Sequence, residues 1–130
     1  NSGDLPLHLA CRYKASHGVI PLLFDEYPKA VEIQNKYGDL PLHAACFSDA
    51  SLDYIKLLIE AYPKAVEIKN NKGSLPLHYA CYSNSSPDVI KILFDAYPKA
   101  AEVKNNHGFL PLHLACTELA TASAANTPID

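Results

Sequence analysis

Two residue types that can bind metals or act as nucleophiles recur along this chain at a fixed step of 35 residues. Histidine nitrogens and cysteine thiolates are the usual ligands of zinc, and two nearby cysteines can form a disulfide. Which chemistry is open to the protein depends on how these repeated positions lie relative to one another. The two series are His8, His43, His78 and His113, and Cys11, Cys46, Cys81 and Cys116.

The spacing of the cysteines argues against both a disulfide and a zinc site. One cysteine per repeat places equivalent side chains about one helix diameter apart, roughly 8–10 Å, in a stacked array. A disulfide needs Cα atoms within about 7 Å, and zinc sites usually draw on close Cys-x-x-Cys pairs, which this sequence lacks. We predict four reduced, buried thiols that act as small apolar side chains, with no metal site and no cofactor. Reduced thiols indicate an intracellular, reducing compartment, above all the cytoplasm.

The histidines have the same spacing, so they are too far apart to converge on one metal ion or to relay protons. We predict instead that they are structural, with one ring nitrogen of each bonded to a neighbouring backbone group. The chain also lacks a nucleophile–base constellation, a phosphate-binding loop and a paired-carboxylate motif. The sequence therefore predicts a protein that is not an enzyme.

The composition is that of a globular protein without a strong net charge. Hydrophobic residues make up 48% of the 130 residues, and 14 acidic and 11 basic side chains give a net charge of −3. This balance offers no argument for nucleic acid as a partner. No apolar run approaches the roughly 20 residues that a membrane span needs, so no membrane partner is expected either.

A repeating unit of two helices must position these residues. The first helix is predicted to start at Pro6 and its equivalents, because proline suits the first helical position, and to end near Lys14. The second helix is more apolar, and Ser16, Ser51 and Ser86 are its predicted N-caps. These signals recur in register with the histidines and cysteines, so the unit itself is helical.

The second helix of each unit leads into a proline and then a turn. In the first unit, Pro21 lies inside this helix and predicts a late start or a bend. Tyr27 and its equivalents mark the helix end, because the residue before a proline is pushed out of the helical region. An extended segment such as 31–33 is expected next, followed by a tight turn at Gly38 and its equivalents.

Together these elements predict an all-α solenoid of about seven helices that forms a single domain over residues 1–130. Each unit contacts only its neighbours in such an array, so its core is a row of similar interfaces. The units are expected at about 3–37, 38–72 and 73–107, followed by a partial unit at 108–120 and a tail at 121–130.

The motif Gly-x-x-Pro-Leu-His-x-Ala, which starts at Gly3, Gly38, Gly73 and Gly108, resembles the ankyrin repeat. The four matches keep their register from Gly3 to about Cys116. Leucine replaces the family's usual threonine before Pro-Leu-His, so the threonine hydroxyl that caps the helix and bonds the histidine is absent. The period is 35 residues instead of the family's usual value of about 33. These departures affect fine geometry and leave the fold expectation unchanged.

The resemblance implies a non-catalytic module that binds another protein or a peptide segment on the concave face of the solenoid. Partners of the family usually lie against the hairpin tips and the exposed face of the first helix. The matching positions are Arg12, Tyr13, Lys36, Tyr37, Asp39, Phe47, Ser48, Asn71, Lys72, Ser74, Tyr82, Ser83, Asn106, His107 and Phe109, with Thr117 and Glu118 in the partial unit. The units differ most on this face, which suggests that each unit makes its own contacts there.

Two groups on this surface allow more than one interpretation. The first is an aromatic track that either binds a partner or packs between repeats: Tyr13, Phe47, Tyr82 and Phe109. The second is a basic edge that would favour an acidic partner, although solvated lysines are the plainer interpretation: Lys36, Lys69, Lys72 and Lys104. The tyrosines that end the second helices are expected to pack: Tyr27, Tyr62 and Tyr97.

The two ends of the array suggest an alternative, structural function. Solenoids normally cover their end units with polar caps, and neither end of this sequence shows one. The chain would then be an array segment that stacks end to end on other copies, or that belongs with additional repeats.

Overall fold

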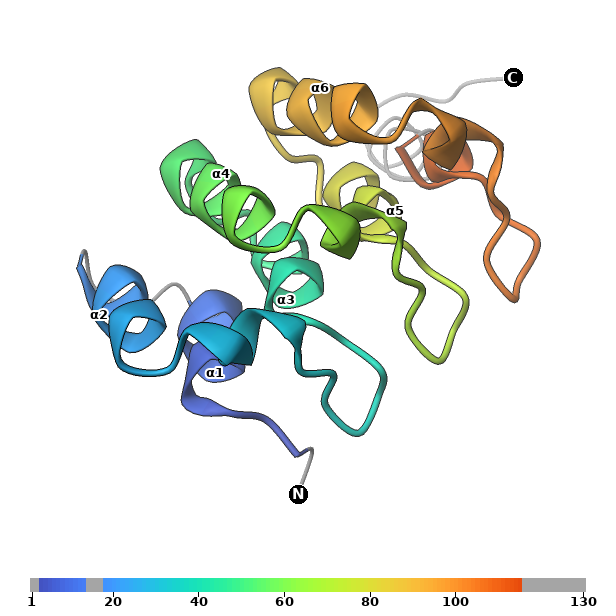
Figure 1. Ribbon diagram of the computed structural model, residues 1–130. Helices are drawn as coiled ribbons and strands as arrows, with labels where there is room; N and C mark the ends of the chain where they lie inside the picture. The colour runs from blue at the N-terminus through green and yellow to red at the C-terminus, as the bar shows by residue number, and fades with distance from the viewer. Residues whose placement is uncertain (1–2, 14–17, 116–130) are drawn as a thin grey trace, which may run out of the picture.

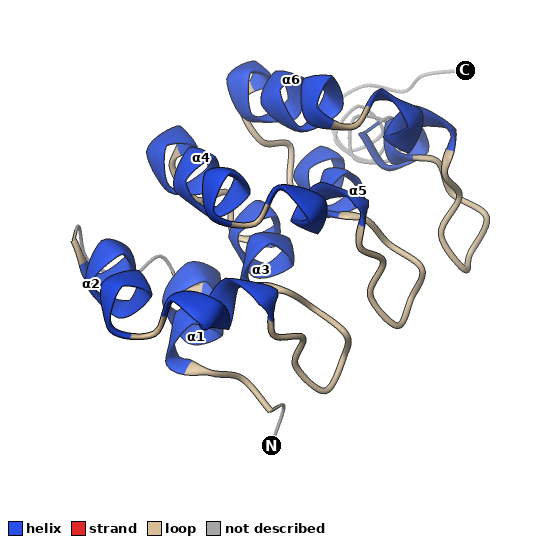
Figure 2. Ribbon diagram, in the orientation of Figure 1, coloured by secondary structure: helices blue, strands red, loops and turns tan. Residues whose placement is uncertain are grey.

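The chain folds into two rows of stacked helices, as the computed structural model of residues 3–13 and 18–115 shows (Figure 1). The inner helices are α1 (Pro6–Arg12), α3 (Pro41–Phe47) and α5 (Pro76–Tyr82), and the outer helices are α2 (Val19–Glu26), α4 (Leu52–Ala61) and α6 (Pro87–Ala96). A seventh α-helix begins at Pro111, and its end lies outside the described residues. The predicted all-α solenoid is confirmed, because the described part of the chain contains helices and loops but no strand (Figure 2).

The core is built from the same positions in successive units. Leu7, Leu42 and Leu77 of the inner helices are between 1% and 4% exposed. Small side chains lie beside them, and Ala45 and Cys46 are fully buried. Because alanine and cysteine occupy little volume, α1, α3 and α5 approach closely and form the central row of contacts.

Each inner helix starts as the sequence predicts, with a proline at its first position and a leucine at the N-cap. A leucine side chain cannot accept a hydrogen bond, so it leaves the backbone groups of the first turn without a cap of the usual kind. The histidine three residues later takes over part of this task by bonding the N–H of the N-cap leucine. Lys14, near which the first helix was predicted to end, lies outside the described residues.

The outer helices confirm two of the predicted caps and correct the third. Ser51 and Ser86 stand at the N-caps of α4 and α6, where their hydroxyl oxygens accept hydrogen bonds from backbone N–H groups. In α2 the N-cap is Gly18, with a φ of 93°, so the prediction of Ser16 is wrong; Ser16 itself lies outside the described residues. The late start caused by Pro21 is confirmed: it now stands in the first turn of α2, where a missing N–H costs no intrahelical bond.

The tyrosine before each proline ends the outer helix as predicted, but the next segment is helical and not extended. A short 3₁₀-helix follows in each unit, namely η1 (Pro28–Glu32), η2 (Pro63–Glu67) and η3 (Pro98–Glu102). In η1, the consecutive residues Ala30 and Val31 are both buried. A strand would point them to opposite faces, so only a tight helical turn can bury both against the neighbouring helices.

The hairpin loops are joined to one another by asparagine side chains. The Asn71 Nδ2 group donates to the Lys36 carbonyl at 3.0 Å, and its backbone N–H donates to the Tyr37 carbonyl at 2.9 Å. One unit later, Asn106 makes the equivalent bonds to the carbonyls of Asn71 and Lys72. These contacts hold the three loops in a row on one side of the helices (Figure 1).

Candidate functional site

The buried histidines join each unit to the next through the backbone. In the second unit, Nδ1 of His43 accepts a hydrogen bond from the Leu40 N–H at 2.9 Å, and Nε2 lies 3.1 Å from the Ser74 carbonyl oxygen. Because a carbonyl oxygen can only accept, the proton is on Nε2 and the ring is neutral. His8 and His78 make the equivalent bonds. The predicted backbone bond is confirmed, and a second bond, to the next unit, adds to it.

Burial keeps these rings uncharged. It lowers the pKa of His43 and of His78 below the ordinary value, because a charged imidazolium would lose its water; at His43 the Asp39 carboxylate opposes this shift without reversing it. Both side chains are fully buried. Their place in the molecule is therefore structural, and they offer no charge or free nitrogen to a ligand.

The cysteines are equally inaccessible. Cys11, Cys46 and Cys81 are buried free thiols, as their spacing predicts, while Cys116 lies outside the described residues. Burial raises the pKa of Cys11 to about 12 and that of Cys81 to about 11, and it raises the pKa of Cys46 as well. Thiols with such values are poor nucleophiles and poor metal ligands. Within residues 3–13 and 18–115, no three histidine, cysteine or acidic side chains cluster as metal ligands.

Two adjacent hollows lie between the inner helices and the hairpin loops. One has a volume of about 370 Å³ and the other about 290 Å³. Phe47, Lys72 and Tyr79 line both hollows, so the two form one continuous feature, which we call the inner groove. It follows the row of units, with α3 and α5 on one side and the hairpin loops on the other.

Exposed aromatic rings form one wall of the inner groove. The rings of Phe47 and Tyr82 are stacked, with centroids 6.3 Å apart and an interplanar angle of 7°. Phe47 also meets Tyr79 edge to face at 5.7 Å. Phe47 is 49% exposed and Tyr82 is 48% exposed. Of the predicted aromatic track, Phe109 also lines the groove, whereas Tyr13, which is 71% exposed, does not.

A small polar network forms the floor of the groove. The Asn70 Nδ2 group donates to Asp39 Oδ1 at 2.8 Å and to the Tyr79 hydroxyl at 2.7 Å. Burial raises the pKa of Tyr79, and the nearby Asp39 carboxylate raises it further. At the edge of the groove, the Arg12 guanidinium forms a salt bridge with Asp4 at 2.8 Å. The network orients the Tyr79 ring, which lines both hollows.

Several predicted contact residues have structural tasks instead. Ser74 is only 4% exposed and its carbonyl oxygen accepts the His43 bond, but it lines the second hollow, so its contact with a partner stays a prediction. The hydroxyl groups of Ser48 and Ser83 donate to the carbonyl oxygens of Cys11 and Cys46 in the preceding unit.

The remaining predicted residues divide between the open surface and the ends of the chain. Of the remaining predicted residues, those exposed on the hairpin loops are Lys36, Tyr37, Asn71, Lys72, Asn106 and His107. The residues of the partial unit and tail lie outside the described range: Thr117, Glu118 and 121–130. Tyr62 and Tyr97 pack against the core as predicted, but Tyr27 is 50% exposed.

Tyr79 and Asn70 complete the groove, although neither was among the predicted contact residues. The signal for Tyr79 was present, since the equivalent positions hold Leu9, Ala44 and Leu114, and a single polar ring in an apolar series is unusual. No comparable signal exists for Asn70, because asparagine recurs in every unit as part of the turn.

The fold and the groove define a helical repeat protein that presents its variable side chains along one face. Residues 58–115 match the family model described as ankyrin repeats in many copies, and the same helical units continue on the N-terminal side of that match. Ankyrin repeats are generally non-catalytic modules for protein–protein interaction. A search of curated proteins found no match. No helix in the described residues is long and apolar enough to cross a membrane.

Proposed function

We propose that this chain is a non-catalytic binding module that holds a segment of another protein in the inner groove. The observation that carries the proposal is the half-exposed stack of Phe47 and Tyr82 beside two hollows. Aromatic residues are enriched at protein interfaces, where a few side chains supply most of the binding energy. The residues proposed to contact the partner are Arg12, Tyr13, Lys36, Tyr37, Asp39, Phe47, Asn71, Lys72, Tyr79, Tyr82, Asn106, His107 and Phe109.

The apolar area on these rings is large enough to matter. A fully buried aromatic side chain covers about 150–250 Å², so covering the exposed half of one ring removes roughly 100 Å² from water. At about 25 cal/mol per Å², this is worth about 2 kcal/mol for each ring before the costs of association. The polar floor would then orient a partner without supplying most of the affinity.

The proposal is tested with Phe47→Ala and a matched control. Phe94 of α6 is 42% exposed, but it lies on the outer row, away from the groove. The partner is captured with the wild-type chain, identified by mass spectrometry and purified. Its affinity is then measured for the wild type and for each variant. We expect Phe47→Ala to weaken its binding about tenfold or more, and Phe94→Ala to leave it unchanged. Equal binding by both variants and the wild type would show that the groove is not the site.

A second candidate function is end-to-end stacking, and the last described unit favours it. Leu112 is 69% exposed, whereas the equivalent Leu7, Leu42 and Leu77 are at most 4% exposed because a following unit covers them. We infer that another copy of the chain or an additional repeat covers Leu112. Sedimentation at rising concentration would show self-association that Leu112→Ser removes; a strict monomer would contradict stacking between copies.

Two further inferences concern the chain as a whole. We infer that residues 1–130 form one domain, because each inner helix contacts the outer helix of its own unit and the inner helix of the neighbouring unit. We also infer a reducing, intracellular compartment, most simply the cytoplasm. The support for this location is the set of three buried free thiols, which are typical of proteins that fold under reducing conditions.

A further inference from the structure

We propose that the partner segment is acidic, with carboxylates that meet the lysines of the hairpin loops while its apolar side chains enter the inner groove. This inference rests on the proposed function and adds the chemistry of the partner. The lysines that carry it are Lys36, Lys69, Lys72 and Lys104, all exposed on the three loops at 33–39, 68–74 and 103–109.

The charges of the molecule are separated between its two sides. The three hairpin loops hold four lysines and a single acidic residue, Asp39. The outer helices and the 3₁₀-helices hold five lysines but nine acidic residues, and all nine are exposed: Asp25, Glu26, Glu32, Asp53, Glu60, Glu67, Asp88, Asp95 and Glu102. The net charge of −3 is therefore the sum of a basic edge on one side and an acidic surface on the other.

The basic edge keeps its charge available. The salt bridges within residues 3–13 and 18–115 join Arg12 to Asp4 and Lys91 to Asp95, and neither involves a hairpin lysine. Asp39, the one acid in the loops, is only partly exposed, and the Asn70 side chain bonds one of its oxygens. An approaching carboxylate would therefore meet lysines whose charge no acidic side chain of their own loops offsets.

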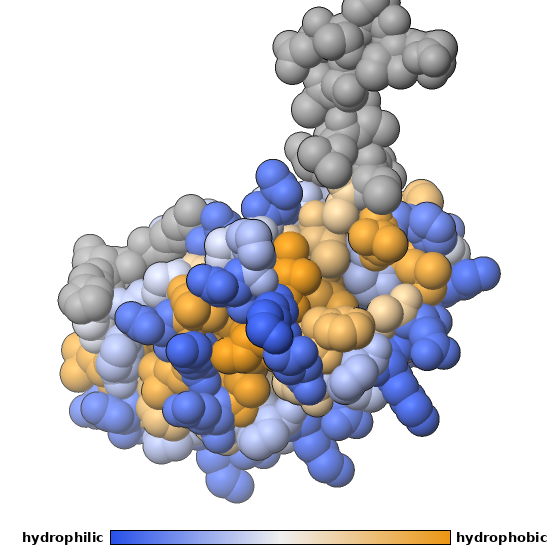
Figure 3. Space-filling view, turned by 90° about the horizontal axis from the view of Figure 1, so that it is seen from above, coloured by the Kyte–Doolittle hydropathy of each residue, from blue (hydrophilic) through white to orange (hydrophobic). Residues whose placement is uncertain are grey.

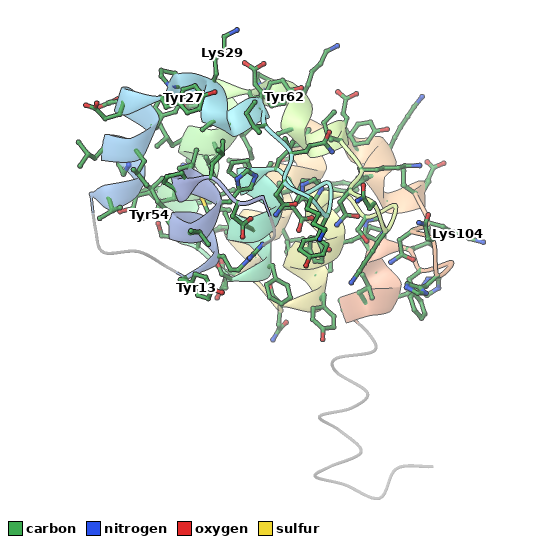
Figure 4. All side chains as sticks on the ribbon, turned by 90° about the horizontal axis from the view of Figure 1, so that it is seen from below. Tyr13, Tyr27, Lys29, Tyr54, Tyr62 and Lys104 are labelled. Carbon is green, nitrogen blue, oxygen red and sulfur yellow. The ribbon has the colours of Figure 1, made fainter. Side chains whose placement is uncertain are left out.

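The basic edge and the aromatic wall are contiguous. Lys72 lines both hollows together with Phe47, and His107 lines the second one. A segment that contacts the rings must therefore pass beside the loops. Figure 4 shows Lys104 well separated from Tyr27, Lys29 and Tyr62, which lie together on another edge. Figure 3 shows hydrophobic patches bordered by hydrophilic side chains on the face seen from above the view of Figure 1.

A peptide suits this surface better than a nucleic acid does. Long polyanions gain affinity from many phosphate contacts, whereas four lysines on one edge offer few, and the nine acids of the outer side would repel the remainder of the strand. The hollows beside Phe47 and Tyr79 also call for apolar side chains of the partner. Acidic residues interspersed with aromatic ones supply both kinds of contact.

The experiment uses a random copolymer of glutamate and tyrosine as the probe and a copolymer of lysine and tyrosine as its charge-reversed counterpart. The test variant is K36E/K72E on the hairpin edge. The matched control is K29E/K64E, which makes the same change in net charge at exposed lysines of the 3₁₀-helices. Binding to the immobilised copolymer is measured at about 0.1 M and about 1 M salt. This increase in salt shortens the Debye length from about 10 Å to about 3 Å.

We expect the wild type to bind the glutamate copolymer, to lose most of this binding at high salt, and to discriminate against the lysine copolymer. K36E/K72E should lose about tenfold or more in affinity, and K29E/K64E less than about twofold. Equal losses in the two variants, or equal binding of both copolymers, would overturn the proposal. So would tighter binding of a polyuridine RNA than of the glutamate copolymer.

The same variants separate this inference from the proposed function. If the captured partner loses affinity with Phe47→Ala but binds K36E/K72E as tightly as the wild type, the groove is the site and the acidic chemistry is wrong. If Phe47→Ala has no effect, the proposed function fails as well. Circular dichroism and the melting temperature of each variant confirm that the four charge changes leave the fold intact.

Discussion

Replacing His43 by alanine should destabilise the protein more than any change on its surface. The ring is fully buried and bonds the Leu40 N–H at 2.9 Å and the Ser74 carbonyl at 3.1 Å. Alanine leaves the Leu40 N–H buried without a partner, which costs about 1–3 kcal/mol, whereas the Ser74 carbonyl keeps the bond that the Asn70 N–H donates. With the cavity that the missing ring leaves, the expected loss is about 3–5 kcal/mol. This is a large part of the roughly 5–15 kcal/mol that holds a typical domain folded.

Urea unfolding followed by circular dichroism measures this loss, and His113→Ala is the matched control. His113 makes the same bond to the Leu110 N–H at 2.9 Å, but its side chain is exposed, so water can replace the bond. We expect a loss below about 1 kcal/mol there. His43→Gln should fall between the two, since a glutamine at the third helical position can reach back to the N-cap N–H.

The reasoning would be refuted if His43→Ala and His113→Ala lost similar amounts of stability. It would also be refuted if His43→Gln were no better than His43→Ala, because the bond to the N-cap leucine would then contribute nothing. Either result would mean that the histidine positions serve packing volume alone.

Two further predictions follow from the same contacts. Because burial lowers the pKa of His43 and His78 in the folded state, the unfolded chain binds more protons below its own histidine pKa of about 6.5. Stability is therefore complete above that pH and falls as the pH drops toward the folded-state pKa values; a melting temperature unchanged between about pH 7.5 and about pH 5.5 would contradict this. At Gly38 (φ 79°), an added Cβ would lie 2.7 Å from the Asn71 backbone nitrogen, whereas at Gly108 (φ 81°) it meets nothing within 4 Å. Gly38→Ala should thus lower the unfolding free energy by about 2 kcal/mol more than Gly108→Ala, and equal losses in urea unfolding would show that only backbone strain matters.

Local signals predicted most of the helices. A proline at the first position, a serine at the N-cap and a tyrosine before a proline each act within one turn of backbone, so they can be read without knowing what lies nearby. The same locality explains the late start of α2, since Pro21 constrains only its own turn. The 3₁₀-helices were missed, although each begins at a proline, because the inward turn of the residues that follow depends on packing between units. Ala30 and Val31 turn inward to fill space between neighbouring helices.

The groove could be predicted only in part, for a related reason. The exposed positions of Phe47 and Tyr82 follow from helical periodicity, but their stacking depends on how closely α3 and α5 pack. Ser74 looks like a surface residue in its own loop, and the following unit buries it. The second bond of each histidine likewise ends on a carbonyl of another unit, which no pattern within one repeat reveals.

The amino-acid sequence by itself determined the 35-residue period, the all-α class and the separation of histidines and cysteines into parallel rows. These follow from repetition, because identical units stacked at a constant spacing hold equivalent side chains one unit apart. Only the tertiary structure decided which variable residues meet in a hollow and which are covered. The physical reason is that side chains of neighbouring units cover part of each unit's surface. The burial of Ser74 and the exposure of Leu112 therefore depend on what lies next to them.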